Sequence, residues 1–192
     1  MPEPETDAPA DEELMLAYKN GDAMAFETLY QRHKGSLYRY MLRQCASKAV
    51  AEELFQDVWM SMIHARKRYR PSAKFSTYLF RVAHNRLIDH YRKNNPAQTG
   101  ENSDQATSDP DEQPGSPQQQ PEQQTFIQQQ IRHLLTCIQA LPLAQRQAFL
   151  LKEEAGLGLH EIARIMDASQ EAAKSRLRYA IKKLRQCMGE YL

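Results

Sequence analysis

The stretch FSTYLFRVAHNRLIDHYRK, residues 75–93, decides how the chain folds and indicates where its functional residues lie. Leu79, Ala83 and Leu87 recur every four residues, which is typical of the buried stripe of an amphipathic helix. Pro96 ends the pattern, because its ring fixes φ and it has no N–H to donate. The stretch is therefore predicted to form one helix with a buried side and an exposed side.

Basic residues and aromatic rings gather on this helix and just before it. Residues 64–93 hold nine Lys or Arg and one acid, Asp89, and the rings among them are Tyr69, Phe75, Tyr78, Phe80 and Tyr91. Cations hold phosphates, and rings or Arg planes stack on bases, so the mixture suits a single nucleic-acid strand. A solvated helix face above core aromatics is the alternative, since charged helix faces are common.

The chain has 192 residues and a formal net charge of only +1, but its charges are unevenly distributed. Residues 1–12 and 94–125 carry acids and no base, whereas residues 174–185 carry six cations and no acid. Bulk charge therefore conceals two basic patches that are separated by acidic segments.

Helical periodicity recurs along the chain and no segment alternates as a strand would, so the predicted fold is all-α, with two helical modules joined by a flexible linker. Residues 1–11 are predicted to be disordered and 12–94 to form the first module. The linker, 95–125, is acidic and rich in Gln and Pro, and it cannot bury enough apolar surface to fold alone. Residues 126–192 form the second module, which begins with an apolar stripe at Phe126, Ile127, Ile131, Leu134, Leu135 and Ile138.

A helix before the opening stretch has one apolar and one polar side. Its apolar row includes Leu54 and Val58, and its polar edge carries Glu53, Gln56 and Asp57. The polar edge is interpreted either as a solvated face or as a docking surface for a basic partner helix.

The C-terminal region has the pattern of a helix-turn-helix. A short helix at 160–166 and a tight turn at 167–169 precede a basic helix from Gln170 to about Cys187, with Ser169 placed to cap it. In such a motif the early residues of the second helix face base edges and phosphates in the major groove. Here these are Glu171, Lys174, Ser175, Arg178 and Tyr179. A solvated or coiled-coil helix is the competing interpretation.

From the spacing of its cysteines and histidines, the chain is predicted to have no metal site and no cofactor and not to be an enzyme. Cys45, Cys137 and Cys187 are far apart and lie among apolar residues, so they are predicted to be buried free thiols in a reducing compartment. The six histidines show no pairing with Cys or carboxylates at catalytic spacing. The acidic N-terminus lacks the apolar run of a signal peptide, and no stretch approaches the ~20 apolar residues of a membrane span.

Several short motifs resemble those of bacterial RNA polymerase sigma factors of the extracytoplasmic-function (ECF) group. In the first module these are Gly21-Asp22, Ala25-Phe26, Leu29-Tyr30, residues 51–54 and 56–59, and residues 75–79 with Ala83, Asn85, Asp89 and Arg92. In the second they are Leu141-Pro142, Gln145-Arg146, residues 161–163 and residues 174–177. The resemblance covers about residues 12–94 and 126–187.

The resemblance implies a promoter-specificity subunit in the bacterial cytoplasm, without cofactors or membrane insertion. Its expected partners are core RNA polymerase, through the β′ clamp and the β flap, and promoter DNA; many members of the group are also held by an anti-sigma factor. Polymerase would be bound by Glu53, Gln56 and Asp57. The −10 element would be melted and held by Tyr69, Lys74, Phe75, Tyr78, Arg81, Asn85 and Arg92, and the −35 element read by Glu171, Lys174, Ser175, Arg178 and Tyr179.

The sequence departs from the group around the reading helix. Asp167 stands where Gly is frequent, Glu171-Ala172 replaces a common Gly-Thr pair, and Tyr179 replaces a frequent Arg. These changes leave open which −35 DNA sequence the helix reads, and they leave the fold prediction unchanged. A stand-alone helix-turn-helix regulator is the rival function, and it would leave the acidic edge and the aromatic-basic helix without a role.

Overall fold

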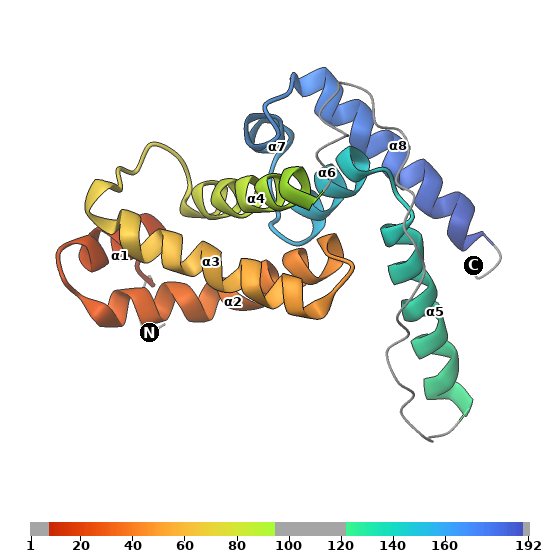
Figure 1. Ribbon diagram of the computed structural model, residues 1–192, viewed down its shortest axis with the longest axis horizontal. Coiled ribbons are helices and arrows are strands. Elements are labelled where there is room, and N and C mark those ends of the chain that lie inside the picture. The colour runs from red at the N-terminus through yellow and green to blue at the C-terminus, as the bar shows by residue number, and fades with distance from the viewer. Residues whose placement is uncertain (1–7, 95–121, 190–192) are drawn as a thin grey trace, which may run out of the picture.

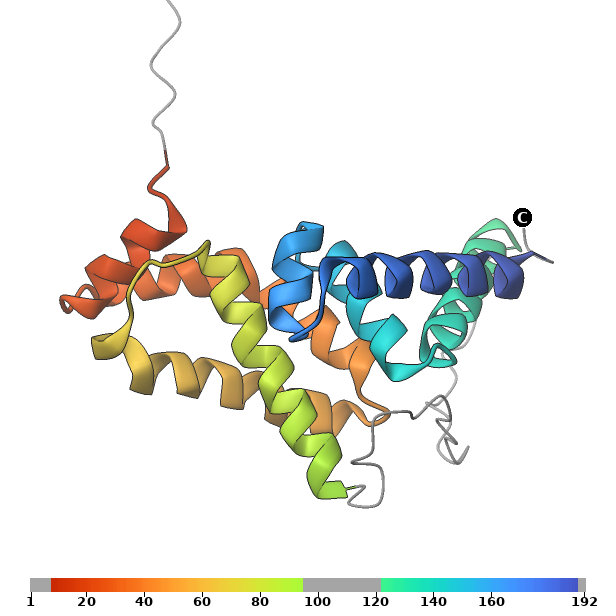
Figure 2. The ribbon, with the colours of Figure 1, turned by 90° about the horizontal axis from the view of Figure 1, so that it is seen from above.

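The computed structural model describes residues 8–94 and 122–189, and all regular structure within these ranges is helical (Figure 1). The elements are α1 (Asp11–Lys19), α2 (Ala23–Gln44), α3 (Lys48–Ala65), the 3-10 turn η1 (Arg66–Arg68), α4 (Phe75–Asn94), α5 (Glu122–Gln139), α6 (Leu143–Glu153), α7 (Leu159–Ile165) and α8 (Gln170–Met188). The predicted all-α fold is confirmed. The helices form two groups, α1–α4 and α5–α8, which lie side by side (Figure 2).

The first module is organised by α2 and α4. The Asp22 carboxylate caps α2 by accepting from the backbone N–H of Met24 at 2.9 Å, directly after Gly21, whose φ of +109° lies in the region that favours glycine. α2 then runs without interruption to Gln44. α4 buries the predicted stripe of Leu79, Ala83 and Leu87, so the side of the helix that faces the core is as expected.

The second module contains the predicted helix-turn-helix. Asp167, between α7 and α8, has a φ of +48°, a conformation that Asp tolerates better than most residues do. The Ser169 hydroxyl then accepts from the N–H of Ala172 at 3.1 Å and caps α8. Buried Ile162 and Ala163 of α7 belong to the same core as Ala173 of α8. The tight turn therefore fixes α8 against α7 with its first turns exposed.

Two predicted boundaries shift in the structure. α1 begins at Asp11, inside the segment predicted to be disordered; residues 1–7 of that segment lie outside the described ranges. α5 begins at Glu122, inside the predicted linker 95–125, and residues 95–121 lie outside the described ranges. No described helix is both long and apolar enough to cross a membrane.

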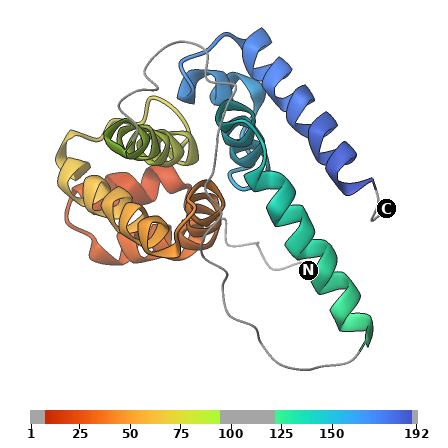
Figure 3. The ribbon, with the colours of Figure 1, turned by 45° about the vertical axis from the view of Figure 1, so that its right-hand side comes forward.

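The apolar stripe predicted on α5 is mostly not buried. The N-terminal end of α5 projects away from the other helices (Figure 3), and Phe126, Ile127 and Ile131 remain 56%, 59% and 52% exposed. Among the side chains of α5 whose burial is described, residues 126–139, only Cys137 and Ile138, near its C-terminal end, belong to the core. The periodicity correctly identified the helix, but a periodic stripe does not specify whether another element covers it.

The cysteine prediction is wrong for two of the three residues. Cys137 of α5 and Cys187 of α8 form a disulfide, with 5.9 Å between their Cα atoms, and Cys187 is exposed. Cys45 is a buried free thiol, as predicted, and burial raises its pKa to about 11. Sequence spacing concealed the disulfide because its two cysteines are 50 residues apart.

Candidate nucleic-acid interface

The polar edge of α3 is available to a partner. Glu53, Gln56 and Asp57 are all exposed, and their spacing places them on one face of the helix. Leu54 and Val58, on the other side, are buried in the core. The edge is thus a fixed row of polar side chains on a well-anchored helix.

On α4, four side chains of the predicted −10 set are open to solvent or near it. Arg81, Asn85 and Arg92 are exposed at spacings of four and seven residues, which lie along one side of a helix. Lys74, at the end of the preceding loop, is also exposed, and Tyr78 is half-buried. These side chains form a polar and cationic surface above the buried stripe.

Tyr69 and Phe75, which are also predicted for the −10 set, do not belong to that exposed surface. Both rings are buried, at 4% and 1% exposure, and so neither offers a face to a base in this structure. The Tyr69 ring packs against Tyr78 with 5.3 Å between centroids, and burial raises the pKa of its hydroxyl to about 12. The Phe75 ring packs against His33 at 5.2 Å. Both rings support the loop from beneath.

The start of α4 is held by residues of α1, far away in the sequence. A Glu12 carboxylate oxygen accepts from the backbone N–H of Phe75, and the Lys19 ammonium donates to the carbonyl of Tyr69 at 2.9 Å. The loop before α4 is therefore tied at both ends. Sequence reasoning missed Glu12 and Lys19, because these contacts span 63 and 50 residues and leave no local pattern.

The first turns of α8 present the predicted −35 set as one face. Glu171, Lys174, Arg178 and Tyr179 are exposed, and Ser175 is half-buried. The Arg178 guanidinium lies over the Tyr179 ring, 5.2 Å from its centroid. This stacking orients the Arg178 cation on the exposed face of α8.

The two modules are joined by polar contacts that the sequence did not predict. The Glu154 carboxylate, with 6% of the side chain exposed, bridges Arg39 and Arg43 of α2. Glu161 of α7 accepts from the Thr77 hydroxyl of α4 at 3.0 Å. These pairs hold the helix-turn-helix module against α2 and α4.

A cleft of about 540 Å³ lies between α4 and the second module, and it is lined by Asn85 and Arg92 on one side and by Asp167 and Arg176 on the other. His84, at the same place, is buried, and desolvation together with the nearby Arg176 charge lowers its pKa to about 4. Part of the predicted −10 surface therefore faces the second module in this arrangement.

Two sequence families match the chain, one in each module. Sigma-70 region 2 matches residues 29–96, and Sigma-70 region 4 matches residues 131–184. The RNA polymerase sigma factor CarQ of Myxococcus xanthus is 29% identical over 185 residues, covering 92% of this chain and 96% of CarQ. The ECF RNA polymerase sigma factor SigK of Mycolicibacterium vanbaalenii is 28% identical over 178 residues, covering 92% and 88%.

Solved structures share the fold. CnrH, in complex with the cytosolic domain of CnrY, superposes with a TM-score of 0.68 at 19% identity, covering 95% of this chain and 99% of CnrH. The sigma factor RpoE of Bartonella quintana, in complex with the anti-sigma factor NepR, gives a TM-score of 0.64 at 18% identity, with coverage of 85% and 96%. At these identities the likeness concerns the fold alone.

Proposed function

Because this chain belongs to the ECF group of RNA polymerase sigma factors, which act in transcription initiation, we propose specific roles for three of its helices. The acidic edge of α3 docks on the β′ clamp of core polymerase, α4 captures the −10 element, and α8 reads the −35 element. The observation that carries the proposal is the order of the two matched regions along one chain, each with an exposed polar face.

The residue roles follow from exposure and charge. Glu53, Gln56 and Asp57 form the polymerase contact, since they are exposed acids and an amide on one helix face. The open −10 contacts are Lys74, Arg81, Asn85 and Arg92, with Tyr78 at their edge. The −35 contacts are Glu171, Lys174, Ser175, Arg178 and Tyr179. The buried rings of Tyr69 and Phe75 position the loop that carries Lys74.

The modules must move apart for this function. Two promoter elements lie roughly 55–60 Å apart at about 3.4 Å per base step, whereas here Glu154 and Glu161 hold the modules in contact. Binding to polymerase would supply the energy to separate them and would join two weak DNA contacts into one strong one through effective concentration.

The cellular compartment and a further protein partner follow from the same role. We propose that the chain works in the cytoplasm, where core polymerase is found, and that it performs no reaction chemistry of its own. An anti-sigma factor is a candidate partner, since the solved RpoE structure holds one.

The test is transcription in vitro with core polymerase on a promoter library. Specific initiation that depends on this chain is the expected result. Strong sequence-specific binding of duplex DNA by the chain alone, with no initiation, would instead favour a stand-alone regulator.

Asn85→Ala separates strand capture from duplex binding. Loss of one exposed amide should reduce promoter opening, measured by permanganate reactivity of unpaired thymines, by about tenfold, which corresponds to about 1.4 kcal/mol. Closed-complex formation at low temperature should be nearly unchanged. The control is Arg86→Ala, whose guanidinium contacts Ser61 of α3. Equal loss of opening and of closed complexes would contradict the role of Asn85 in capture.

A further inference from the structure

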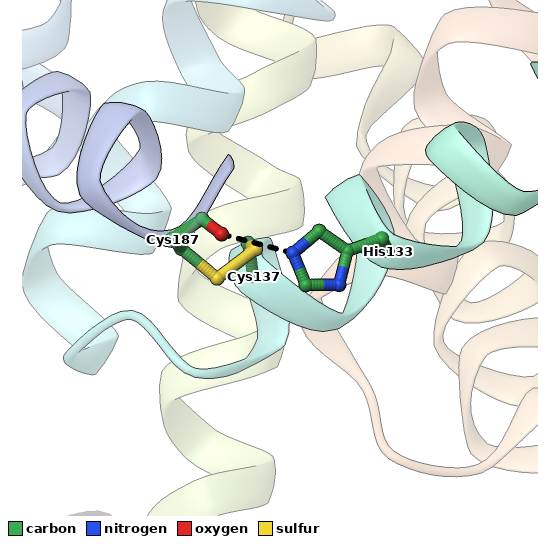
Figure 4. Close-up of side chains that lie close together, drawn as sticks. All are labelled: His133, Cys137 and Cys187. Carbon is green, nitrogen blue, oxygen red and sulfur yellow. Dashed lines mark hydrogen bonds between the residues drawn. A yellow bond between two sulfur atoms is a disulfide. The ribbon is translucent and has the colours of Figure 1, made fainter. Parts of the chain in front are cut away.

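α5 and α8 bring three metal-ligating side chains together at the C-terminal end of α8 (Figure 4). His133 and Cys137 are four residues apart and so lie on one face of α5, while Cys187 approaches from α8. Their ligand atoms all lie within 4.8 Å of one another, and a ring nitrogen of His133 is 2.9 Å from the carbonyl oxygen of Cys187.

The donor set has a specific chemistry. Two thiolates and one imidazole are ligands that Zn²⁺ takes up in tetrahedral sites, at about 2.3 Å for sulfur and about 2.0–2.1 Å for nitrogen. In the structure the two sulfurs are joined to each other. We propose that, once this disulfide is reduced, Cys137, Cys187 and His133 form a Zn²⁺ site, so that the cluster alternates between a disulfide and a bound metal.

The geometry permits the exchange with small movements. Two sulfurs on one tetrahedral Zn²⁺ lie about 3.8 Å apart, given the usual bond length, so the disulfide sulfurs must separate. Cys187 is exposed and lies in the last turn of α8, two residues before its C-cap, Gly189. Its side chain and its turn can therefore shift, while Cys137 remains anchored in the core. His133 exchanges its contact with the Cys187 carbonyl for the metal, and solvent provides the fourth ligand.

The chemical steps balance with one named co-reactant. A dithiol reductant donates two electrons to the disulfide by thiol–disulfide exchange and itself becomes a disulfide, while its two protons pass to the sulfurs of Cys137 and Cys187. Binding of Zn²⁺ then displaces both thiol protons to solvent. In the reverse direction the disulfide form of the same reductant accepts the two electrons by thiol–disulfide exchange, which re-forms the bond between Cys137 and Cys187 and releases Zn²⁺.

The cluster leaves the DNA face of α8 open. Lys174 and Arg178 lie in the N-terminal half of α8, toward the other end of the helix from the cluster. A metal bound by the cluster would not compete with DNA for these residues.

The test uses the full-length chain, reduced with a dithiol and desalted without oxygen. Titration with Co²⁺, a spectroscopic substitute for Zn²⁺, should give one equivalent of binding with thiolate-to-cobalt absorption, and Zn²⁺ should displace it. The oxidised chain should bind none. If the reduced chain shows no thiolate-to-cobalt absorption, the cysteines form a structural disulfide without metal affinity and the proposal is overturned.

Single substitutions locate the site. Cys137→Ser and Cys187→Ser should abolish thiolate-to-cobalt absorption at one equivalent, whereas Cys45→Ser, at the buried free thiol, should leave the titration unchanged. His133→Asn should weaken binding tenfold or more, and since it retains both cysteines, its disulfide-linked form reports whether the fold is intact. Unchanged affinity in His133→Asn, or loss of binding in Cys45→Ser, would overturn the proposed ligand set.

Discussion

Replacing Glu154 by Gln should loosen the contact between the two modules. The carboxylate of Glu154 is nearly buried and bridges Arg39 and Arg43, which lie four residues apart on α2. Burial and the neighbouring Arg39 charge lower the pKa of Arg43, which indicates that two cations are crowded at this point. Gln has almost the same volume as Glu but no charge, so the substitution removes the electrostatic interaction and little packing.

The magnitude follows from exposure. Hydrogen bonds to charged groups contribute about 1.5–3 kcal/mol each. Breaking a fully buried pair costs about 3–5 kcal/mol, because it leaves a buried charge without compensation. Here the arginine side chains are 53% and 31% exposed, so water can solvate them after the substitution. We therefore expect a loss of about 1.4 kcal/mol, which raises the ratio of open to closed molecules about tenfold.

Single-molecule energy transfer measures this ratio. Dyes introduced through unnatural amino acids at Met60 of α3 and Lys183 of α8, both exposed, report the separation of the modules. Glu153→Gln, at the exposed neighbouring position, is the matched control and should leave the ratio near that of the native chain. Increasing salt should open the native chain more than the Glu154→Gln variant, because screening acts on the bridge. No rise in the open fraction for Glu154→Gln, or an equal rise for Glu153→Gln, would refute the reasoning.

Three other perturbations test the remaining surfaces. Asp57→Arg should keep the helical content but weaken association with core polymerase tenfold or more, as measured by native gel shift; unchanged association would remove the docking assignment. Lys174→Ala with Arg178→Ala should reduce the salt slope of holoenzyme binding to −35 DNA by about 1.8, since each phosphate contact contributes about 0.9; an unchanged slope would place the phosphate contacts elsewhere. The pKa of His84 falls from 6.5 to about 4 on folding, so the imidazole is held neutral in the folded chain. Its contribution to stability is present at pH 7 and is lost as pH falls from about 6.5 towards 4, because the unfolded chain then binds a proton that the folded chain does not. The expected loss at pH 5 is about 2 kcal/mol in urea unfolding, and a His84→Phe variant that shows the same pH dependence would contradict it.

The local features of this protein were predictable from its sequence. A helix is recognised by apolar residues three and four positions apart, so the stripe on α4 could be identified without coordinates. The start of a helix is recognised by a cap within three residues, which identified Asp22 and Ser169. The tight turn at 167–169 was also predicted, and the positive φ of Asp167 lies within it. Exposure of the polar faces of α3 and α8 followed, because each lies opposite a buried apolar row.

The contacts between distant residues were decided by the tertiary structure alone. Nothing near Glu154 in the sequence indicates Arg39, which lies 115 positions away, and the separation of 50 positions between Cys137 and Cys187 concealed their disulfide. Tyr69 and Phe75 looked like exposed rings among cations, yet packing turns both into the core. The physical reason is one of range: helical periodicity arises from neighbours along the chain, whereas burial and ion pairing depend on which helices pack together.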